Sequence, residues 1–263
     1  MLRSLTTAGT GMTAQQLNLD TISNNLANVN TNGFKSQRAN FQDLIYQTYR
    51  MSGASGGGTV SQPVAMQIGL GTQFASTSSD FSSGPLQSTG NSMDLAIAGE
   101  GFFKVELPNG DFAYTRDGSF QTNANGEMVT ADGYPVVPNI TFPAGATQIT
   151  VSANGIVSCQ VPGQNQPQTL GQIKLTLFPN PGGLTRVGQN LYAPGGASGD
   201  ATDVNAGDAG SGQVQSGFVE GSNVNIVTEM VSMITAQRAY EINSKAVQTA
   251  DDMLSDLNSL KPS

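Results

Sequence analysis

The chain has 263 residues, with 11 lysines and arginines against 19 aspartates and glutamates, no histidine, no tryptophan and one cysteine. These counts exclude a Ser-His-Asp triad, a Cys-His pair, a His-ligated zinc site and an internal disulfide. The formal charge of −8 argues against a nucleic-acid partner, which would need a basic patch. Charged residues make up only 11% of the chain, against about 25% in typical soluble domains. Such a composition favours a protein whose surfaces become interfaces.

Residues 1–7 lack the apolar core of a cleaved export signal, and no run approaches the ~20 apolar residues that span a bilayer. We therefore expect no membrane insertion, and either a cytoplasmic location or export without a cleaved signal. Glycine is distributed unevenly, since only Gly9, Gly11 and Gly33 fall in residues 1–40 and none falls in 222–263. Glycine costs about 1 kcal/mol relative to alanine inside a helix. The two ends are therefore predicted to be helical and the middle is not.

The first 28 residues carry a seven-residue repeat that predicts a coiled-coil seam. The helix should stop near Asn28, because residues 30–33 supply turn chemistry. Gln15, Gly9 and Gly11 make the seam imperfect. The residues predicted to contact another copy of the chain on this helix are Leu5, Met12, Leu19, Ile22, Leu26 and Val29.

The last segment predicts a second helix with caps at Ser222, Asn223 and Asn225, and with Glu229 favourable in its first turn. Its apolar face is broader than one seam requires, so this helix is expected to need neighbours on more than one side. The predicted interface residues on it are Ile226, Met230, Met233, Tyr240, Ile242, Val247, Leu254 and Leu257.

The middle of the chain predicts a mainly antiparallel β domain, because strand-like runs alternate with Asn-Gly and Asp-Gly turns such as 109–110 and 154–155. Residues 195–212 should form a long loop. The fold class is therefore α+β, with a central Gly-rich β domain between helices that pair. The predicted divisions are the N-terminal helix with its adjoining segment (1–45), an extended linker or arm (46–90), the β-rich domain (91–221) and the C-terminal helix (222–263).

No pattern predicts catalysis, a metal or a cofactor. Gly99-Glu100-Gly101 precedes a strand and not a helix, so it fails as a dinucleotide-binding fingerprint. Nearby acidic residues are typical of turns, and Cys159 is expected to be packed in a strand. The exposed apolar faces of the two amphipathic ends instead favour self-assembly. A head-to-tail contact between copies that does not form a closed ring gives a filament or tube.

Three blocks of sequence resemble the bacterial flagellar rod and hook family. They are 24–35 (NNLANVNTNGFK), 99–103 with 114–120 (GEGFF and YTRDGSF), and 237–247 (QRAYEINSKAV). Their order and full-length spread identify the chain as similar to this family, and its length and residues 47–73 are most like those of the distal-rod members. The residues that carry the resemblance are Asn28, Thr31, Gly33, Phe34, Lys35, Gly101, Phe102, Phe103, Arg238 and Tyr240.

The resemblance implies a non-enzymatic subunit that leaves the cell through the flagellar type III export apparatus and assembles in the periplasm. Its paired terminal helices would line a tube and its β domain would form the outer wall. That tube would carry motor torque to the hook and conduct later subunits. The implied partners are the chain itself, proximal rod proteins, hook or hook-junction proteins, and the surrounding P- and L-rings.

Two alternatives remain open. A proximal rod or hook subunit of the same family would differ in the diameter and straightness of its assembly. A different class, an extracellular carbohydrate-active enzyme or adhesin on a β scaffold, would need convergent carboxylates or sugar-stacking aromatics. The absence of tryptophan and an aromatic content of 6% weigh against it.

Overall fold

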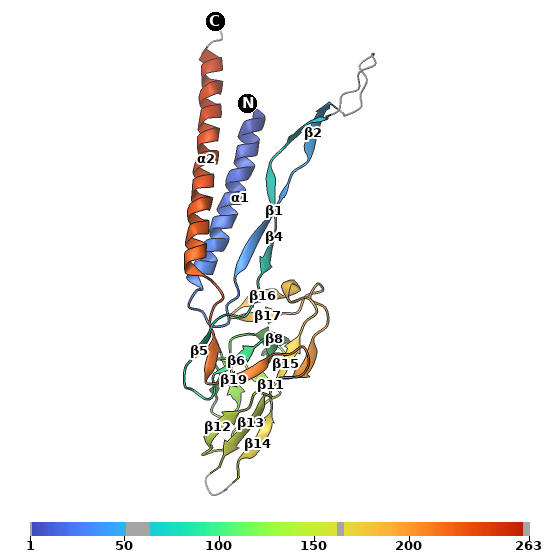
Figure 1. Ribbon diagram of the computed structural model, residues 1–263, viewed down its shortest axis with the longest axis vertical. Coiled ribbons are helices and arrows are strands. Elements are labelled where there is room, and N and C mark those ends of the chain that lie inside the picture. The colour runs from blue at the N-terminus through green and yellow to red at the C-terminus, as the bar shows by residue number, and fades with distance from the viewer. Residues whose placement is uncertain (1, 51–63, 162–165, 260–263) are drawn as a thin grey trace. The chain divides into compact units, whose positions relative to one another are not determined.

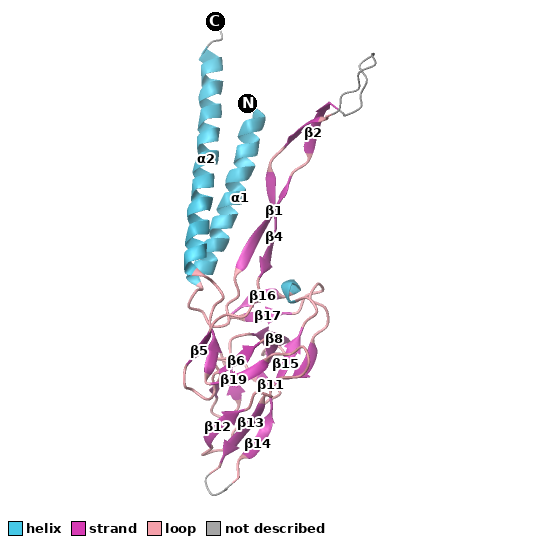
Figure 2. Cartoon of the chain, viewed as in Figure 1, coloured by secondary structure: helices cyan, strands magenta, loops and turns pink. Residues whose placement is uncertain are grey.

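The computed structural model describes residues 2–50, 64–161 and 166–259, and the chain folds into two compact units. The first unit contains Met1–Leu26, Gln37–Ser78 and Ile226–Ser263, and the second contains Ala27–Ser36 and Ser79–Asn225. The predicted terminal helices and antiparallel β middle are confirmed (Figures 1 and 2). Neither helix, over its described residues, has a stretch long and apolar enough to cross a membrane.

Helix α1 spans Leu2–Ala27 and ends one residue before the predicted stop. Thr6 and Thr10 each donate a hydroxyl hydrogen bond to the backbone carbonyl three residues earlier. Beyond the helix, the Asn28 carbonyl accepts from the Thr31 amide, and Gly33 adopts a φ of 67°. Val29, predicted as part of the helical seam, therefore lies outside the helix, because the turn begins at Asn28.

Helix α2 spans Ile226–Ser259 and carries Glu229 in its first turn. Ser222 accepts a hydrogen bond from the Val224 amide at 3.3 Å. Asn223 does not cap the helix, because its side chain binds the backbone of Ser36 and Asp80 instead. The predicted cap at Asn223 is therefore wrong: the helix begins three residues later, and this amide is used within the second unit.

The first unit also contains an arm of paired strands in the region where we expected an extended linker. Strand β1 (Gln37–Asp43) pairs with β4 (Thr72–Ser79), and β2 (Tyr46–Arg50) pairs antiparallel with β3 (Met66–Gly69). The rings of Phe41 and Phe74 meet edge to face at 6.0 Å. Residues 51–63, which belong to the expected linker, lie outside the described residues. Threonines and aromatics suit strands in the parts that are described.

The second unit is built around one larger sheet. In order across the sheet, its strands are β16 (Thr185–Gly188), β17 (Leu191–Ala193), β8 (Phe112–Thr115), β7 (Phe102–Glu106), β15 (Lys174–Leu177) and β18 (Thr202–Asn205), and β11 (Val136–Val137) pairs with β7. The expected turns are confirmed. Asn109-Gly110 joins β7 to β8, and Asn154-Gly155 joins β12 (Thr147–Val151) to β13 (Ile156–Gln160). The loop predicted over 195–212 is wrong at Thr202–Asn205, because this segment pairs with β15 along the sheet edge.

A short 3-10 helix, η1 (Pro181–Gly183), precedes β16. The smaller sheets contain β5 (Leu86–Ser88) with β20 (Phe218–Glu220), β6 (Leu95–Ala98) with β19 (Gln213–Ser216), β9 (Gln121–Thr122) with β10 (Met128–Val129), and β12 (Thr147–Val151), β13 (Ile156–Gln160) and β14 (Gln168–Gln172) together.

The second unit has a continuous apolar core in which Phe103, Leu95 and Leu175 are fully buried. Cys159 is buried in β13, as expected for a small strand residue. A second, aromatic cluster contains Phe102, Tyr114, Phe178, Leu184 and Tyr192. Because burial of apolar area is the main favourable term in folding, this core is the main source of the stability of the second unit.

Candidate assembly interface

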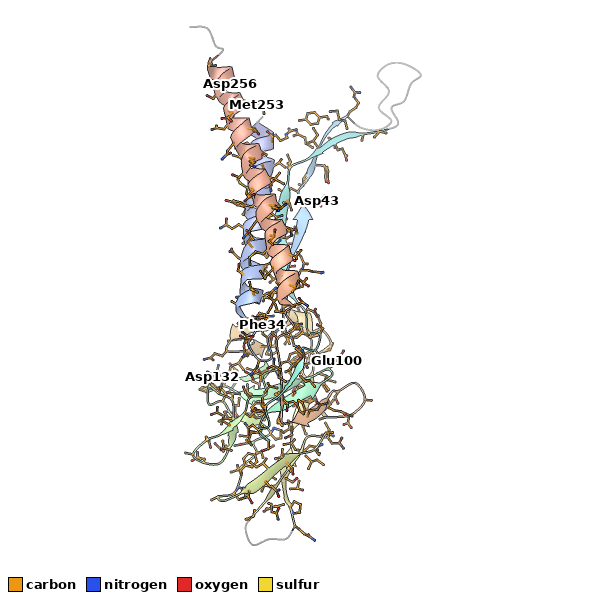
Figure 3. All side chains as sticks on the ribbon, turned by 60° about the vertical axis from the view of Figure 1, so that its left-hand side comes forward. Phe34, Asp43, Glu100, Asp132, Met253 and Asp256 are labelled. Carbon is orange, nitrogen blue, oxygen red and sulfur yellow. The ribbon has the colours of Figure 1, made fainter. Side chains whose placement is uncertain are left out.

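Helices α1 and α2 run antiparallel and side by side within the first unit (Figures 1 and 3). They approach closely where Gly11 faces Asn243, since a Cβ atom added at Gly11 would lie 2.9 Å from the Asn243 Nδ2 atom. Asn25 donates to the Gln37 carbonyl at 2.8 Å and to the Glu229 carboxylate at 3.4 Å. Burial raises the pKa of Glu229, while the Asn25 hydrogen bond opposes the shift.

The predicted interface residues on α1 are only partly covered. Ile22 is buried, whereas Leu5, Met12, Leu19 and Leu26 are half-buried. The other apolar residues buried on this helix are the small Ala8 and Ala14. The apolar side chains of α1 therefore retain surface that a second chain could cover.

The predicted interface residues on α2 are more exposed. Ile226, Met230, Tyr240 and Ile242 are exposed, and Ile242 shows 67% of its surface. Met233, Val247 and Leu254 are half-buried, while the side chain of Leu257 lies outside the described residues. Tyr240 and Arg238, which also carry the family resemblance, are exposed on this helix.

Sequence reasoning missed three further apolar residues on α2. Val227, Val231 and Ile234 are exposed, at spacings of four and three residues that place them on one helix face. The face that is buried within the unit carries Ala236 and Ala250 instead. The fully buried apolar residues of α2 are thus small, whereas many of its large aliphatic residues are exposed, which is the reverse of an ordinary surface helix. A contiguous exposed apolar face of this kind marks an interaction site.

The arm adds exposed apolar residues that the sequence reasoning also missed. Ile45, Tyr46, Tyr49, Met66 and Ile68 are all exposed on or beside β2 and β3. In β3 the alternation of Met66 and Ile68 with Gln67 was the available signal. Exposed apolar side chains on both the helix and the arm therefore extend the candidate interface of the first unit.

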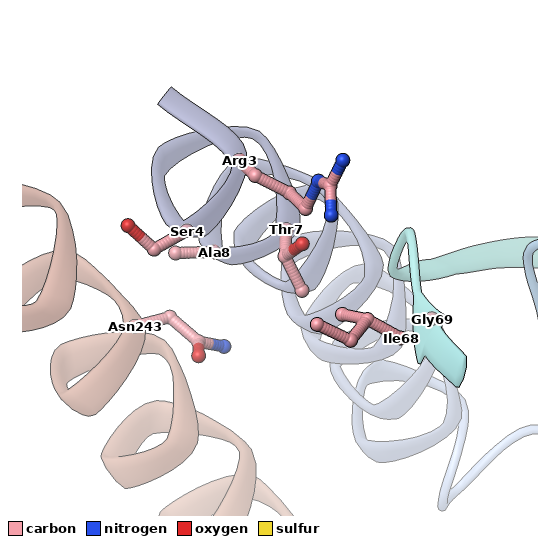
Figure 4. Close-up of a pocket in the computed structure, with 7 residues that line it drawn as sticks. All are labelled: Arg3, Ser4, Thr7, Ala8, Ile68, Gly69 and Asn243. Carbon is pink, nitrogen blue, oxygen red and sulfur yellow. The ribbon is translucent and has the colours of Figure 1, made fainter. Parts of the chain in front are cut away.

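An open cavity of about 460 Å³ lies between α1, β3 and α2 in this unit (Figure 4). Its wall includes Asn243 from α2, Ile68 from β3 and Ala8 from α1. Arg3, at its edge, donates hydrogen bonds to Tyr49 and Gln47, and its guanidinium carbon lies 5.1 Å from the Tyr49 ring centre. The cavity leaves room for side chains from outside the unit.

The second unit contains a buried group of three charges, which we call the junction cluster: Lys35, Arg116 and Glu220. The Lys35 Nζ atom lies 2.6 Å from one Glu220 carboxylate oxygen, and the Arg116 Nη1 atom lies 3.3 Å from the other. All three side chains are almost completely buried. Burial lowers the pKa of Lys35 and that of Arg116, and the Glu220 charge opposes both shifts.

Gly33 and Phe34 place Lys35 in this cluster. The Gly33 amide donates to the Glu220 backbone carbonyl at 2.7 Å. At φ 67° a Cβ atom on Gly33 would lie 2.6 Å from the Asp117 amide nitrogen, so only glycine fits. Phe34 is buried, with the Arg186 guanidinium carbon 5.0 Å from its ring centre.

The sequence block 99–103 with 114–120, which is part of the family resemblance, contributes buried side chains and a cation–π contact to the second unit. Phe103 lies in the main core, while Phe102 lies in the aromatic cluster with the Arg116 guanidinium carbon 5.3 Å from its ring centre. Gly101 adopts a φ of 129° close to Leu175. Asn28 and Thr31 are joined by a side-chain hydrogen bond of 3.1 Å in the turn before Gly33.

The residues that carry the family resemblance therefore form two groups. One group, from Asn28 to Lys35 with Gly101 to Phe103, lies in the second unit, and the other, Arg238 and Tyr240, lies on α2. Sequence reasoning missed Glu220, because a single glutamate at the end of a short strand has no distinguishing local signal.

Across the described part of the chain, no three Asp, Glu or Cys side chains are grouped closely enough to bind a metal ion. The polar groups that converge are instead the buried ion pairs of the junction cluster. Exposed apolar faces and a buried structural cluster define the class of the protein as a subunit of a larger assembly.

Comparison with known families agrees with this class. Residues 5–35 match the flagella basal body rod protein model, residues 96–159 match the flagellar hook protein FlgE/F/G D1 domain, and residues 215–260 match the flagellar basal body rod FlgEFG protein C-terminal model. The chain is 51% identical to the flagellar basal-body rod protein FlgG of Borreliella burgdorferi, over 99% of both chains. It is 48% identical to FlgG of Caulobacter vibrioides, over 99% of this chain and 100% of that protein. The chain belongs to the family of flagellar basal-body rod proteins.

Proposed function

We propose that this protein is a structural subunit of the bacterial flagellar basal body that self-assembles into the distal rod. The tube that it forms is the drive shaft that transmits motor torque to the hook, and later subunits pass through it. The protein is not an enzyme. The observation that carries this proposal is the outward face of α2, whose aliphatic residues have no partner surface in the first unit. The FlgG relatives, similar over their full length, support the same function.

The energetics favour contact between copies. Fully burying one aliphatic side chain gains about 1.5–3 kcal/mol, so a face that carries Val227, Val231 and Ile234 supplies a substantial driving force. Few charges oppose the contact, because only 11% of the residues are charged. Many identical copies can therefore pack their terminal helices without strong repulsion.

The terminal helices supply the subunit interface, in which the predicted residues of α1 and α2 form coiled-coil-like seams that line the tube. The β-rich unit forms the outer wall. Further partners are proximal rod proteins, hook or hook-junction proteins, the P- and L-rings and the flagellar type III export apparatus. The protein acts in the part of the basal body that spans the periplasm, which it reaches without a cleaved signal peptide.

A sibling function, as a proximal rod or hook subunit, is separated by the straightness and diameter of the assembly. The full-length similarity to FlgG relatives favours the distal rod. A carbohydrate-active enzyme or adhesin is not supported by the family to which the chain belongs.

The substitution Ile242→Asp tests the interface, because it places a charge on the outward face of α2. We expect it to abolish rods and swimming while the second unit stays folded, as judged by the near-ultraviolet circular dichroism of the purified protein. Val187→Asp is the matched control, since Val187 is similarly exposed at 58% but lies on β16. Normal rods in cells that carry Ile242→Asp would reject this interface, as would an equal loss with Val187→Asp.

A further inference from the structure

The chain passes between its two units after Leu26, Ser36, Ser78 and Asn225. In the second unit, three segments adjoin these passages: residues 27–36, 79–84 and 220–225. They continue directly into α1, β1, β4 and α2. The chain therefore enters and leaves the first unit at these segments.

Two side chains bind all three segments to one another. Lys35, in the first segment, donates to the Ser82 carbonyl at 2.8 Å and to the Glu220 carboxylate at 2.6 Å. Asn223, in the last segment, accepts from the Ser36 amide at 2.7 Å and donates to the Asp80 carbonyl at 2.9 Å.

The carboxylate of Glu220 has three partners in this network. It accepts from Lys35, from Arg116 and from the Gly84 amide at 2.9 Å. Glu220 thus joins residues of the first and second segments to Arg116, which follows β8 in the main sheet. The cluster contains two cationic side chains and one carboxylate, so it holds one more buried positive charge than negative. Among the described residues the Arg116 Nε atom has no hydrogen-bond partner.

Such a cluster is a poor way to gain stability alone. Removing three charges from water carries a large desolvation cost, and apolar side chains of similar volume often stabilise a buried site equally well or better. Buried ionic groups differ from apolar groups in their directional geometry, because a carboxylate with several donors permits only one arrangement of the segments that supply them.

We propose that Glu220, with Lys35 and Arg116, is a positioning residue for rod assembly. The junction cluster sets the spacing of the three segments, so that the helices and the arm of every copy start from the same points. This inference rests on the proposed rod function. In a tube built of many copies, differences in the positions at which the helices and the arm begin add up from subunit to subunit. Uniform positions therefore matter more to the assembly than to the single chain.

The test replaces the charges with apolar groups of similar size, in the variant Lys35→Met/Arg116→Met/Glu220→Leu. The matched control is Lys104→Met/Asp203→Leu, which removes the partly exposed 3.0 Å ion pair between β7 and β18. Spin labels at Asn30→Cys and Ser83→Cys, in a Cys159→Ala background, report the distance between the first two segments by electron paramagnetic resonance. Rods are counted by electron microscopy of basal bodies.

We expect the triple variant to unfold at nearly the wild-type temperature, to show a broadened distance distribution, and to form rods about tenfold less often, which corresponds to about 1.4 kcal/mol. The control should match the wild type in all three measurements. A triple variant that keeps both the narrow distribution and the wild-type rod number overturns the proposal.

Glu220→Asp provides a second test that retains every charge and withdraws the carboxylate by one methylene group. We expect the same broadening and the same loss of rods, so wild-type behaviour in both measurements also overturns the proposal, even where the triple variant fails to fold. If the wild-type chain itself formed no rods, the proposed function would fail instead, and the two failures are therefore distinguishable.

Discussion

At the residue scale, Gly33 shows how one backbone position carries a family motif. Its positive φ and its approach to the Asp117 amide allow the chain to turn so that Phe34 and Lys35 enter the second unit. Neither requirement is visible in the local sequence, where Asn32-Gly33 is simply a turn signal. The turn was therefore predictable, but its contact with residues more than eighty positions away was not.

We predict that Gly33→Ala destabilises the second unit far more than Gly90→Ala does. Both glycines have φ near 70°, so both substitutions carry the strain of a left-handed conformation, about 1 kcal/mol. Only at Gly33 does the new methyl group also meet backbone atoms, whereas nothing lies within 4 Å at Gly90. Thermal unfolding of the two variants beside the wild type measures the difference, and equal losses would contradict this explanation.

At the scale of elements, α1 and α2 were predicted from low glycine content and apolar periodicity, and the structure confirms both helices. The periodicity did not show which face would be buried within the chain. The structure buries Ala236 and Ala250 on the inward face of α2, and the two helices approach closely at Gly11 and Asn243. Part of the broad apolar face of α2 remains exposed, and its need for a second neighbour stays a prediction.

Because their large apolar residues remain exposed, the helices of the isolated monomer should be less stable than the core strands. We expect backbone amides in α1 and α2 to exchange with solvent much faster than those of β7, β8 and β15 in dilute protein, and to gain protection on assembly. Hydrogen–deuterium exchange followed by mass spectrometry measures both states. Protection of the monomer's helices equal to that of the core strands would refute this.

At the scale of the whole molecule, each unit is assembled from segments distant in sequence. The second unit has its own apolar core and takes in residues 27–36, while α1 and α2 belong to the other unit although they lie at opposite ends of the chain. This division differs from consecutive domains, because residues 27–36 are grouped with the β-rich unit and 37–78 with the helices.

Removal of both helices tests the division of roles between the units. A chain limited to residues 27–225 keeps the junction cluster and the apolar core, so we expect it to retain the near-ultraviolet circular dichroism of the second unit. It should form no rods, because the proposed interface is lost. Straight rods built from this shortened chain, or swimming cells that contain it alone, would disprove the role of the helices.

The sequence by itself determined the kinds of elements, their approximate bounds and the family, because periodicity, glycine placement, turn dipeptides and three motifs are local properties. Tertiary structure alone decided that Lys35 and Glu220, 185 residues apart, share one buried ion pair, and which face of α2 remains open. The physical reason is that periodicity, glycine placement and turn dipeptides reflect the conformational preferences of residues that are close together in the sequence. Burial and charge pairing instead depend on which distant segments pack together, and no short stretch of sequence specifies that.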